Sequence, residues 1–184
     1  SAPANPASGL DFIGSMDWLP NTDGVLYFVR EILPIIRRTL PQARLSVVGR
    51  TPSPEITALK SDPHIEVTGT VPDIRPYVWN AGVSIVPLRI GGGTRLKIYE
   101  SMAARTPVVS TTVGAEGLAV HPPADIRIAD GPEAFARECI VLLQNPTERD
   151  AVAEAAFQMV SREFSWDSVT RSFEEVLESG PTLC

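Results

Sequence analysis

The sequence is poor in cysteine, histidine and basic residues, and each shortage excludes a class of protein. Two cysteines and two histidines in 184 residues are too few for a disulfide framework or for a metal cluster of Cys or His, so we expect no metal site. The setting is expected to be reduced and cytoplasmic. Sixteen Lys and Arg face 22 Asp and Glu, and this formal charge of -6 argues against a nucleic-acid partner. Apolar runs fall short of the roughly 18 residues that cross a bilayer, so no transmembrane segment is expected.

The length and composition fit one domain, or one half of a two-domain protein. Hydrophobic residues make up 43% of the chain, which is enough to build a packed core. Residues 1–9 are small and Pro-rich, and are expected to be a disordered tail, a linker or a cloning remnant. Residues 179–184 are expected to be a mobile tail. The folded domain is therefore placed at residues 10–178.

Six short apolar runs alternate with helical patterns along this domain. We expect strands over residues 10–14, 44–49, 65–69, 83–87, 107–110 and 125–128. Helices are expected over about 25–40, from 53, and over 74–81, 94–105, 132–144, 147–162 and 166–178. This alternation predicts an α/β fold with a Rossmann-like parallel six-stranded sheet and helices on both faces. Ligands bind such sheets at the carboxyl ends of the strands.

The first helix carries several local signals. Asn21 or Thr22 is expected to cap it, and Asp23 suits its positive end. Pro34 should kink or split the helix. Ser53 followed by Pro starts the next, short helix.

The stretch that carries chemistry is PLRIGGGTRLKIYESMAA, residues 87–104. A strand ends, Gly91, Gly92 and Gly93 follow, and a helix begins with Thr94 as its cap. Glycines let backbone approach a ligand, and the free N–H groups of a first helical turn attract an anion. Arg95 and Lys97 fall in this first turn, where the helix dipole disfavours cations.

A bound diphosphate turns that cost into a gain, since Arg and Lys both pair with phosphate oxygens. Glu100 lies one turn beyond Lys97, where a carboxylate can accept hydrogen bonds from a ribose diol. A plainer interpretation is a tight turn with solvated Arg95 and Lys97 and with Glu100 paired to Lys97. GGGTRLK does not match the Walker pattern, and the loop after the first strand lacks the dinucleotide fingerprint.

Several separated blocks together resemble a known family. They are GSMDWLPNTDG, LSVVG, VTGTVPDIRPY, VPLRIGGGTRLKIYESMA, PVVSTTVGAEG and FSWDSV. In order and spacing they resemble the C-terminal half of family 4 glycosyltransferases of the GT-B fold, over about residues 10–178. Among these, the resemblance is greatest to sugar transferases associated with exopolysaccharide and protein-sorting loci.

The resemblance implies a nucleotide-sugar donor site. Glu100 matches the second Glu of the family's Glu-x7-Glu element, which holds the ribose hydroxyls, and the start of the helix at Gly93, Thr94 and Arg95 matches the diphosphate contacts. Gly14 and Ser15 match the loop that faces the donor phosphates. The loops around the base are matched by two pairs of residues, Gly49 with Arg50 and Thr70 with Val71.

Two departures from the family pattern stand out. Gly92 replaces the first Glu of that element, which contacts the donor sugar in many relatives. No basic residue follows the first strand, between Met16 and Gly24, where many relatives carry an Arg and a Lys. Arg95 and Lys97 are therefore expected to stabilise the leaving diphosphate.

The resemblance predicts the donor-binding domain of a retaining, hexosyltransferase-type glycosyltransferase. It implies no metal and no cofactor, a UDP-sugar rather than a GDP-sugar donor, and a glycan or lipid-linked acceptor. The acceptor half would be a separate N-terminal domain, so this chain alone should be inactive, and any contact with the inner membrane would be made through that half. The alternatives are a GT-B nucleotide-sugar epimerase and a regulatory α/β module of the receiver type.

The remaining polar and aromatic candidates have plainer interpretations. Asp73 is expected to cap a short helix rather than to bind a ligand. Glu116 either reaches the donor sugar or is a solvated loop charge, and the sequence leaves both open. Trp18 and Trp79 are expected to pack, and both histidines to lie at the surface.

Overall fold

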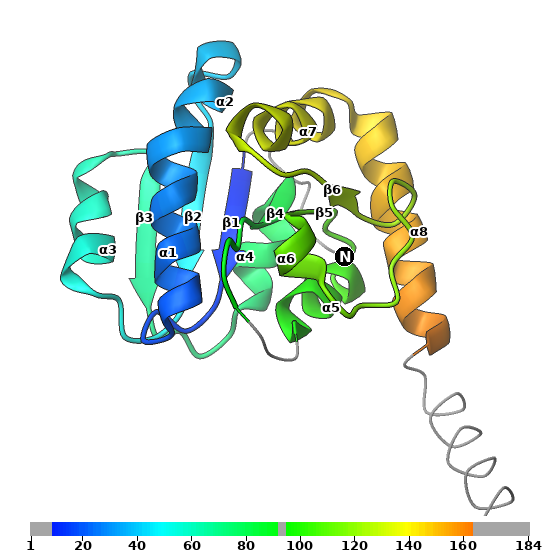
Figure 1. Ribbon diagram of the computed structural model, residues 1–184, viewed down its shortest axis with the longest axis horizontal. Helices are drawn as coiled ribbons and strands as arrows, with labels where there is room; N and C mark the ends of the chain where they lie inside the picture. Colours follow the sequence, from blue (N-terminus) through cyan, green and yellow to red (C-terminus); the bar gives the residue numbers. More distant parts are fainter. Residues whose placement is uncertain (1–8, 92–94, 164–184) are drawn as a thin grey trace, which may run out of the picture.

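A computed structural model describes residues 9–91 and 95–163 of the chain. Six parallel strands form one sheet in the order β3-β2-β1-β4-β5-β6, which is the predicted α/β architecture (Figure 1). The strands are β1 (Gly9–Ile13), β2 (Arg44–Val48), β3 (Ile65–Gly69), β4 (Val83–Val86), β5 (Val108–Ser110) and β6 (Arg127–Ile128). The order reverses between β1 and β4, so the carboxyl ends of these two strands flank the place where such sheets bind ligands.

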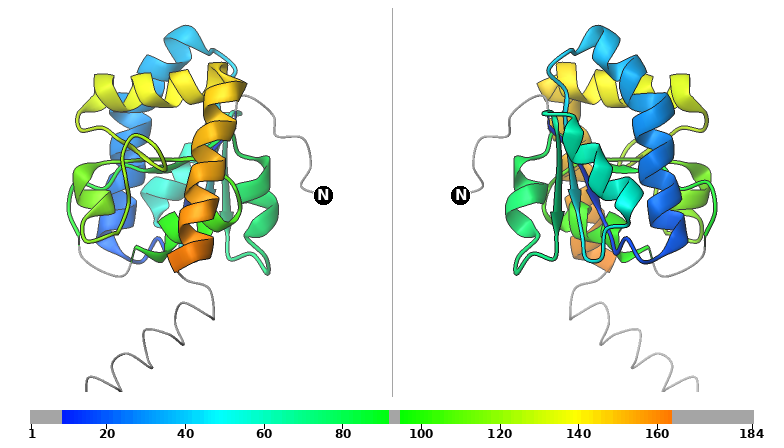
Figure 2. Two further views of the ribbon diagram at one scale, coloured as in Figure 1. Left: turned by 90° about the vertical axis from the view of Figure 1, so that its right-hand side faces the viewer. Right: turned by 90° about the vertical axis from the view of Figure 1, so that its left-hand side faces the viewer.

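Helices cover both faces of the sheet, as expected (Figure 2). One face carries α1 (Leu19–Tyr27), its continuation α2 (Leu33–Thr39), α3 (Pro54–Ala58) and α7 (Pro132–Gln144). The other face carries α4 (Arg75–Asn80) and α5 (Leu96–Ala103), while α8 (Pro146–Glu163) packs against α5 and α7. The short α6 (Thr112–Ala115) follows β5, and η2 (Leu59–Ser61) extends α3. No helix of the described residues is long and apolar enough to span a membrane.

The central strands are buried from both sides. Phe12 of β1 and Ile85 of β4 are almost inaccessible, and all four residues of β4 are buried. Such continuous apolar runs are typical of a parallel sheet between two helical layers. β2 differs, because two alternate residues that share one face of the sheet are less covered: Arg44 is exposed and Ser46 is half-buried. The core therefore lies between β1, β4 and β5 and the helices on each side.

The carboxyl group of Asp11 is buried within this core. Asp11 of β1 is 1% exposed and lies opposite Ser84 of β4, whose hydroxyl donates a 2.6 Å hydrogen bond to it. Burial raises the pKa of Asp11 from 3.8 to about 7, while the Ser84 bond opposes the rise. The second carboxylate oxygen of Asp11 has no hydrogen-bond partner.

The first helix starts earlier than its sequence signals suggested. α1 begins at Leu19 with Pro20 in its first turn, and its N-cap, Trp18, makes no side-chain cap bond. The expected caps, Asn21 and Thr22, are therefore wrong: they lie within the helix and bond to the preceding loop. The sequence LPN places Pro at an early helical position, where its missing N–H costs nothing.

Pro34 has the expected local effect. A π-helical segment, η1 (Phe28–Ile32), separates α1 from α2, whose second residue is Pro34. The wider turn accommodates the ring and the missing N–H of Pro34 without ending the helical run. The expected start of α3 is confirmed, since the Ser53 hydroxyl accepts a 3.3 Å bond from the backbone N–H of Ile56.

Most element boundaries move by one or two residues. β1 includes Gly9, which was assigned to the tail, and β6 is shorter than expected. α5 starts at Leu96 instead of residue 94 and ends at Ala103. The expected helix over 166–178 and the expected tail over 179–184 lie outside the described residues.

Candidate functional site

Three strands end at one pocket on the carboxyl edge of the sheet. The pocket has a volume of about 270 Å³. Its lining comes from the loops after β1, β2 and β3, and includes Gly14, Ser15, Gly49, Arg50, Thr70 and Val71. These six residues were all assigned to donor binding from the sequence, and the fold brings them together. A larger pocket of about 510 Å³, at the start of β1 and β2, includes none of the expected site residues.

Gly49 must be a glycine for the loops to meet, and Gly14 has little room for a side chain. A methyl group on Gly49 would lie 1.8 Å from the carbonyl oxygen of Gly14. A methyl group on Gly14 would lie 2.6 Å from Nδ2 of Asn21 and 2.9 Å from Nζ of Lys97. The Gly14 N–H also donates to the Val48 carbonyl at 3.0 Å, which fixes the end of β1 beside that of β2. The loops are thus held in backbone contact, and the space beside Gly14 is filled by two polar side chains.

A small polar network forms the rim of the pocket. The Ser15 hydroxyl donates to Asp17 at 2.5 Å and accepts a 2.7 Å bond from Nε of Arg50. Arg50 also lies 3.7 Å from the Asp17 carboxylate. The Ser15 hydroxyl, and then the charge of Arg50, hold the pKa of Asp17 below its usual value. Arg50 is thereby tied to the loop after β1, and two thirds of its side chain stays exposed to a ligand.

The loop between β4 and α5 is anchored on both sides. Arg89 donates two hydrogen bonds to Asp23 of α1, at 2.5 and 3.1 Å, and its guanidinium stacks on the ring of Tyr27. The Thr111 hydroxyl donates to the Leu88 carbonyl at 2.5 Å and accepts from the N–H of Gly114, which caps α6. These bonds position exposed Gly91, whereas Gly92, Gly93 and Thr94 lie outside the described residues.

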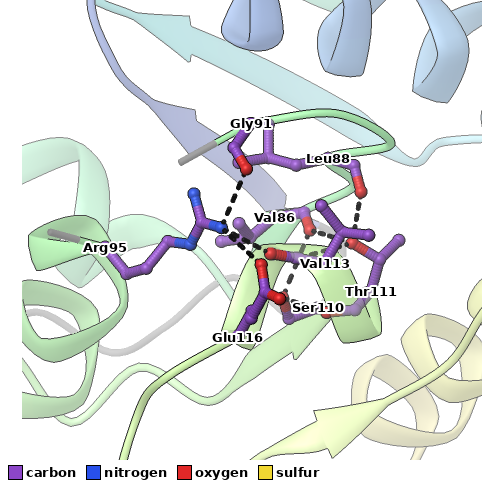
Figure 3. Close-up of polar contacts among 9 residues, drawn as sticks. Val86, Leu88, Gly91, Arg95, Ser110, Thr111, Val113 and Glu116 are labelled. Carbon is purple, nitrogen blue, oxygen red and sulfur yellow. Dashed lines mark hydrogen bonds and ion pairs between the residues drawn. The ribbon is translucent and has the colours of Figure 1, made fainter. Parts of the chain in front are cut away.

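Arg95 occupies a different position from the one expected. It precedes α5 as its N-cap, in the left-handed region at φ 52°, and its side chain is buried. Nη2 donates to the Val113 carbonyl at 2.8 Å and to that of Gly91 at 3.5 Å, and lies 3.7 Å from Glu116 (Figure 3). Among residues 9–91 and 95–163, Nε and Nη1 find no hydrogen-bond partner. Arg95 therefore joins the loops after β4 and β5 and still carries two unused donors.

Lys97 reaches from α5 to the first strand. It lies in the first turn, as expected, and its Nζ donates to Oδ1 of Asn21 at 2.6 Å and sits 4.4 Å from the centre of the Phe12 ring. Burial, and then the charge of Arg95, lower the pKa of Lys97 from 10.5 to about 7, and Glu100 opposes the fall. An anion bound nearby would favour the charged form.

The two glutamates assigned to the donor occupy different surroundings. Glu100 of α5 is exposed, and its carboxylate accepts no hydrogen bond from residues 9–91 or 95–163. Glu116 ends α6, with about three quarters of its side chain exposed and the guanidinium of Arg95 3.7 Å away. Glu116 is thus held at the edge of the site by Arg95 while its carboxylate stays accessible.

The other candidates follow their plainer interpretations in part. Asp73 accepts a 2.9 Å bond from the N–H of Arg75, the first residue of α4, but the N-cap of that helix is Ile74, which makes no side-chain cap bond. Asp73 therefore stabilises the turn that precedes α4 without being its N-cap residue. Trp79 is half-buried beside Arg75, whereas Trp18 remains 39% exposed and does not pack as expected. His121 is exposed and His64 half-buried.

Asn21 has a part in the site that its capping signal did not reveal. Its side chain is 3% exposed and bonds to both the loop after β1 and Lys97. Asp17, which was not among the expected site residues, belongs to the rim network. Within the described ranges, no three His, Cys, Asp or Glu side chains group as metal ligands would.

Comparisons with known proteins agree with this geometry. The chain is 22% identical over 169 residues to an uncharacterized 44.6 kDa protein in the cps region of Klebsiella pneumoniae, covering 88% of this chain and 44% of that protein. It thus spans less than half the length of this curated relative.

Solved structures with the same fold include the C-terminal domain of the group 1 glycosyl transferase LpcC from Francisella tularensis. That match has 18% identity and a TM-score of 0.71, and covers 86% of each chain. HepE of Anabaena, solved with UDP and glucose, matches with 16% identity and a TM-score of 0.73 over 94% of this chain and 48% of that one. Residues 8–145 match the family described as Glycosyl transferases group 1, and the chain therefore belongs to this family.

Proposed function

We propose that this chain is the donor-binding domain of a retaining glycosyltransferase. The observation that carries the proposal is the pocket at the ends of β1, β2 and β3, with the part-buried ammonium group of Lys97 next to Gly14 and the buried guanidinium of Arg95 at the start of α5. The pocket would take the base of a nucleoside diphosphate sugar. The diphosphate would lie between the Gly14–Ser15 loop and the start of α5, and the ribose would reach Glu100.

The chemistry follows from the charge that develops when the sugar leaves. Departure of the nucleoside diphosphate concentrates negative charge on its oxygens, and fixed donors in a water-poor site lower the barrier. Lys97 supplies an ammonium group and Arg95 two unused N–H donors at this place. The free N–H groups of the first turn of α5 add a positive potential. Glu116 is positioned to accept from hydroxyl groups of the sugar.

We further propose UDP as the nucleotide and a glycan or lipid-linked sugar as the acceptor. HepE, which shares the fold, was solved with UDP and glucose, and the Klebsiella relative is described as encoded in a cps region. These resemblances favour a UDP-hexose donor and exopolysaccharide synthesis. The low cysteine content suits a cytoplasmic location.

A separate acceptor domain completes the proposal. The chain covers 44% of the Klebsiella relative and 48% of HepE, whereas it covers 86% of the isolated C-terminal domain of LpcC. One wall of a two-domain cleft can bind a donor but cannot orient an acceptor. Residues 1–184 should therefore bind a nucleotide weakly and transfer no sugar, and turnover by this chain alone with donor and acceptor would refute the half-enzyme proposal.

Calorimetric titration with UDP, GDP, ADP and uridine tests the donor site. We expect UDP to bind most tightly and uridine much more weakly, because uridine lacks the diphosphate. Lys97→Met should remove roughly 1.5–3 kcal/mol of UDP binding, about tenfold or more in affinity. Lys60→Met is the matched control, since it removes the other lysine, which is exposed in η2. Equal UDP affinity in both variants would contradict the proposed anion site.

Two other functions remain as alternatives with distinct outcomes. A nucleotide-sugar epimerase of the same fold would bind UDP equally well, so product analysis with the acceptor domain present separates it from a transferase. A regulatory module of the receiver type needs a cluster of acidic residues after the first strand. Here Asp17 is paired with Ser15 and Arg50, which disfavours that function.

A further inference from the structure

Asn21 connects the loop after β1 to the first turn of α5. Its Nδ2 donates to the Ser15 carbonyl at 2.8 Å, and its Oδ1 accepts from Nζ of Lys97 at 2.6 Å. The side chain is 3% exposed, so both contacts are shielded from water. A methyl group on Gly14 would lie 2.6 Å from Nδ2 of Asn21 and 2.9 Å from Nζ of Lys97. Asn21, Lys97 and the loop backbone therefore form one packed unit, although 76 residues separate Asn21 from Lys97.

The two bonds fix which end of the amide faces which partner. A backbone carbonyl can only accept, so Nδ2 must face Ser15, and the remaining oxygen faces the ammonium group. This oxygen holds Lys97 by a strong bond but carries no net charge. The charged groups that act on Lys97 are Arg95 at the start of α5 and Glu100 one turn later.

We infer that Asn21 is a positioning residue: it holds the ammonium group of Lys97 against the Gly14–Ser15 loop and leaves its charge available for a diphosphate. The inference rests on the proposed donor site. A carboxylate at this position would hold Lys97 just as firmly, but would cancel the charge that the diphosphate needs. An apolar residue would leave the ammonium group buried without its acceptor, which costs free energy.

The lowered pKa of Lys97 agrees with this role of Asn21. Burial and Arg95 lower its pKa to about 7, so the free site holds an ammonium group that is easily lost. A neutral acceptor stabilises the charged form only in part. A bound diphosphate supplies the rest and raises the pKa again.

The first test measures the charge state of Lys97 directly. The chain contains two lysines, so 15N-lysine labelling gives two side-chain signals, with exposed Lys60 as the internal reference. Asn21→Asp should raise the pKa of Lys97 by at least one unit, since a carboxylate replaces a neutral oxygen. Asn21→Ala should lower it, because the ammonium loses its acceptor.

Thr22→Val is the matched control. The Thr22 hydroxyl donates a 2.8 Å bond to the Met16 carbonyl, from the same turn of α1 to the same loop, whereas the hydrogen bond of Lys97 goes to Asn21. This variant should lower the stability of the loop but leave the pKa of Lys97 unchanged. A shift in Thr22→Val as large as that in Asn21→Ala would reduce Asn21 to a structural role and overturn the inference.

The second test measures whether Asn21 acts on the diphosphate through Lys97. Asn21→Ala and Asn21→Asp should each weaken UDP binding, Asn21→Asp by about tenfold or more, while uridine binding stays the same. In a Lys97→Met background, Asn21→Ala should cause no further loss of UDP affinity. An equal loss in both backgrounds would contradict the inference.

The two tests also separate this inference from the proposed function. If the wild-type chain binds no UDP, the donor site is wrong, but the pKa of Lys97 in the Asn21 variants still decides whether Asn21 controls its charge. If Asn21→Ala fails to fold, Asn21→Asp, which differs by one atom, gives the same decision. An unchanged pKa in Asn21→Asp would overturn the inference on its own.

Discussion

Replacing Gly49 by alanine tests the close contact between the ends of β1 and β2. The new methyl carbon would lie 1.8 Å from the Gly14 carbonyl oxygen, whereas ordinary contacts start at 3.4 Å. The two backbones would have to separate by about 1.6 Å, the difference between these distances. That movement breaks the 3.0 Å bond from Gly14 N–H to the Val48 carbonyl and displaces Asn21.

The expected cost is large because neither side of the contact can move freely. Forcing backbone apart in a packed region costs roughly 3 kcal/mol or more. Gly131→Ala is the matched control: its φ is +81°, but nothing lies within 4 Å of an added methyl group. Gly131 has φ 81° and ψ 153°, a region almost restricted to glycine, and this backbone strain alone costs an alanine roughly 1–3 kcal/mol. The difference between the two variants isolates the steric collision.

Urea unfolding of the wild type and both variants measures these costs, and UDP titration of the folded fraction measures the pocket. Gly49→Ala should lose more stability than Gly131→Ala and should also lose UDP affinity. Gly131→Ala should keep it, since Gly131 precedes α7, away from the pocket. If Gly49→Ala has the same free energy of unfolding as Gly131→Ala, the argument that the contact between these loops requires a glycine at position 49 is refuted.

Further predictions concern the charged groups. Burial raises the pKa of Asp11 from 3.8 to about 7, so the unfolded chain releases this proton first as pH rises; the free energy of unfolding should fall between about pH 4 and 7, by roughly 4 kcal/mol in total. Asp11→Asn should abolish that slope in urea unfolding at several pH values. Glu100→Gln should weaken UDP binding about tenfold or more, yet leave binding of a 2′,3′-dideoxy nucleotide unchanged. Because the free pKa of Lys97 is about 7, UDP binding at pH 8 should take up a proton, which calorimetry in buffers of different ionisation enthalpy detects.

The sheet was predictable because each strand carries its own local signal. The apolar runs that form β1, β2 and β4 are short, and helical patterns lie between them. A parallel sheet with helices on its faces buries the apolar residues of the strands and of the helices together. The six pocket residues were predicted from the resemblance to the glycosyltransferase family, and the fold brings them together because they follow strand ends that meet at one edge. The length of β6 was overestimated. Residues 125–128 were expected to form the strand, but only Arg127 and Ile128 pair with β5, and both are half-buried at the edge of the sheet.

The start of each of two helices was misjudged for a physical reason. Asn21 and Thr22 are common capping residues, but both bond to the loop that precedes α1, so the helix begins two residues before them. Arg95 was expected within α5 because Thr94 is a plausible cap, which places Arg95 in the first turn. Its contacts with the Val113 carbonyl and Glu116 hold it instead in the left-handed region. Tertiary contacts decided both boundaries, and local preference did not.

The charge state of Lys97 was beyond sequence reasoning for the same reason. Its position after three glycines indicates an anion site, and the helix dipole argument treats it as an exposed cation. The fold instead places its ammonium group, part-buried, between Gly14, the Phe12 ring and Asn21, and the loss of solvent lowers its pKa to about 7. A solvated lysine stays protonated to about pH 10, so its attraction for an anion would change little with pH near neutrality. A buried one with a neutral acceptor favours a ligand that enters the same space with enough negative charge to keep it protonated, which is a requirement that a diphosphate meets and a nucleoside does not.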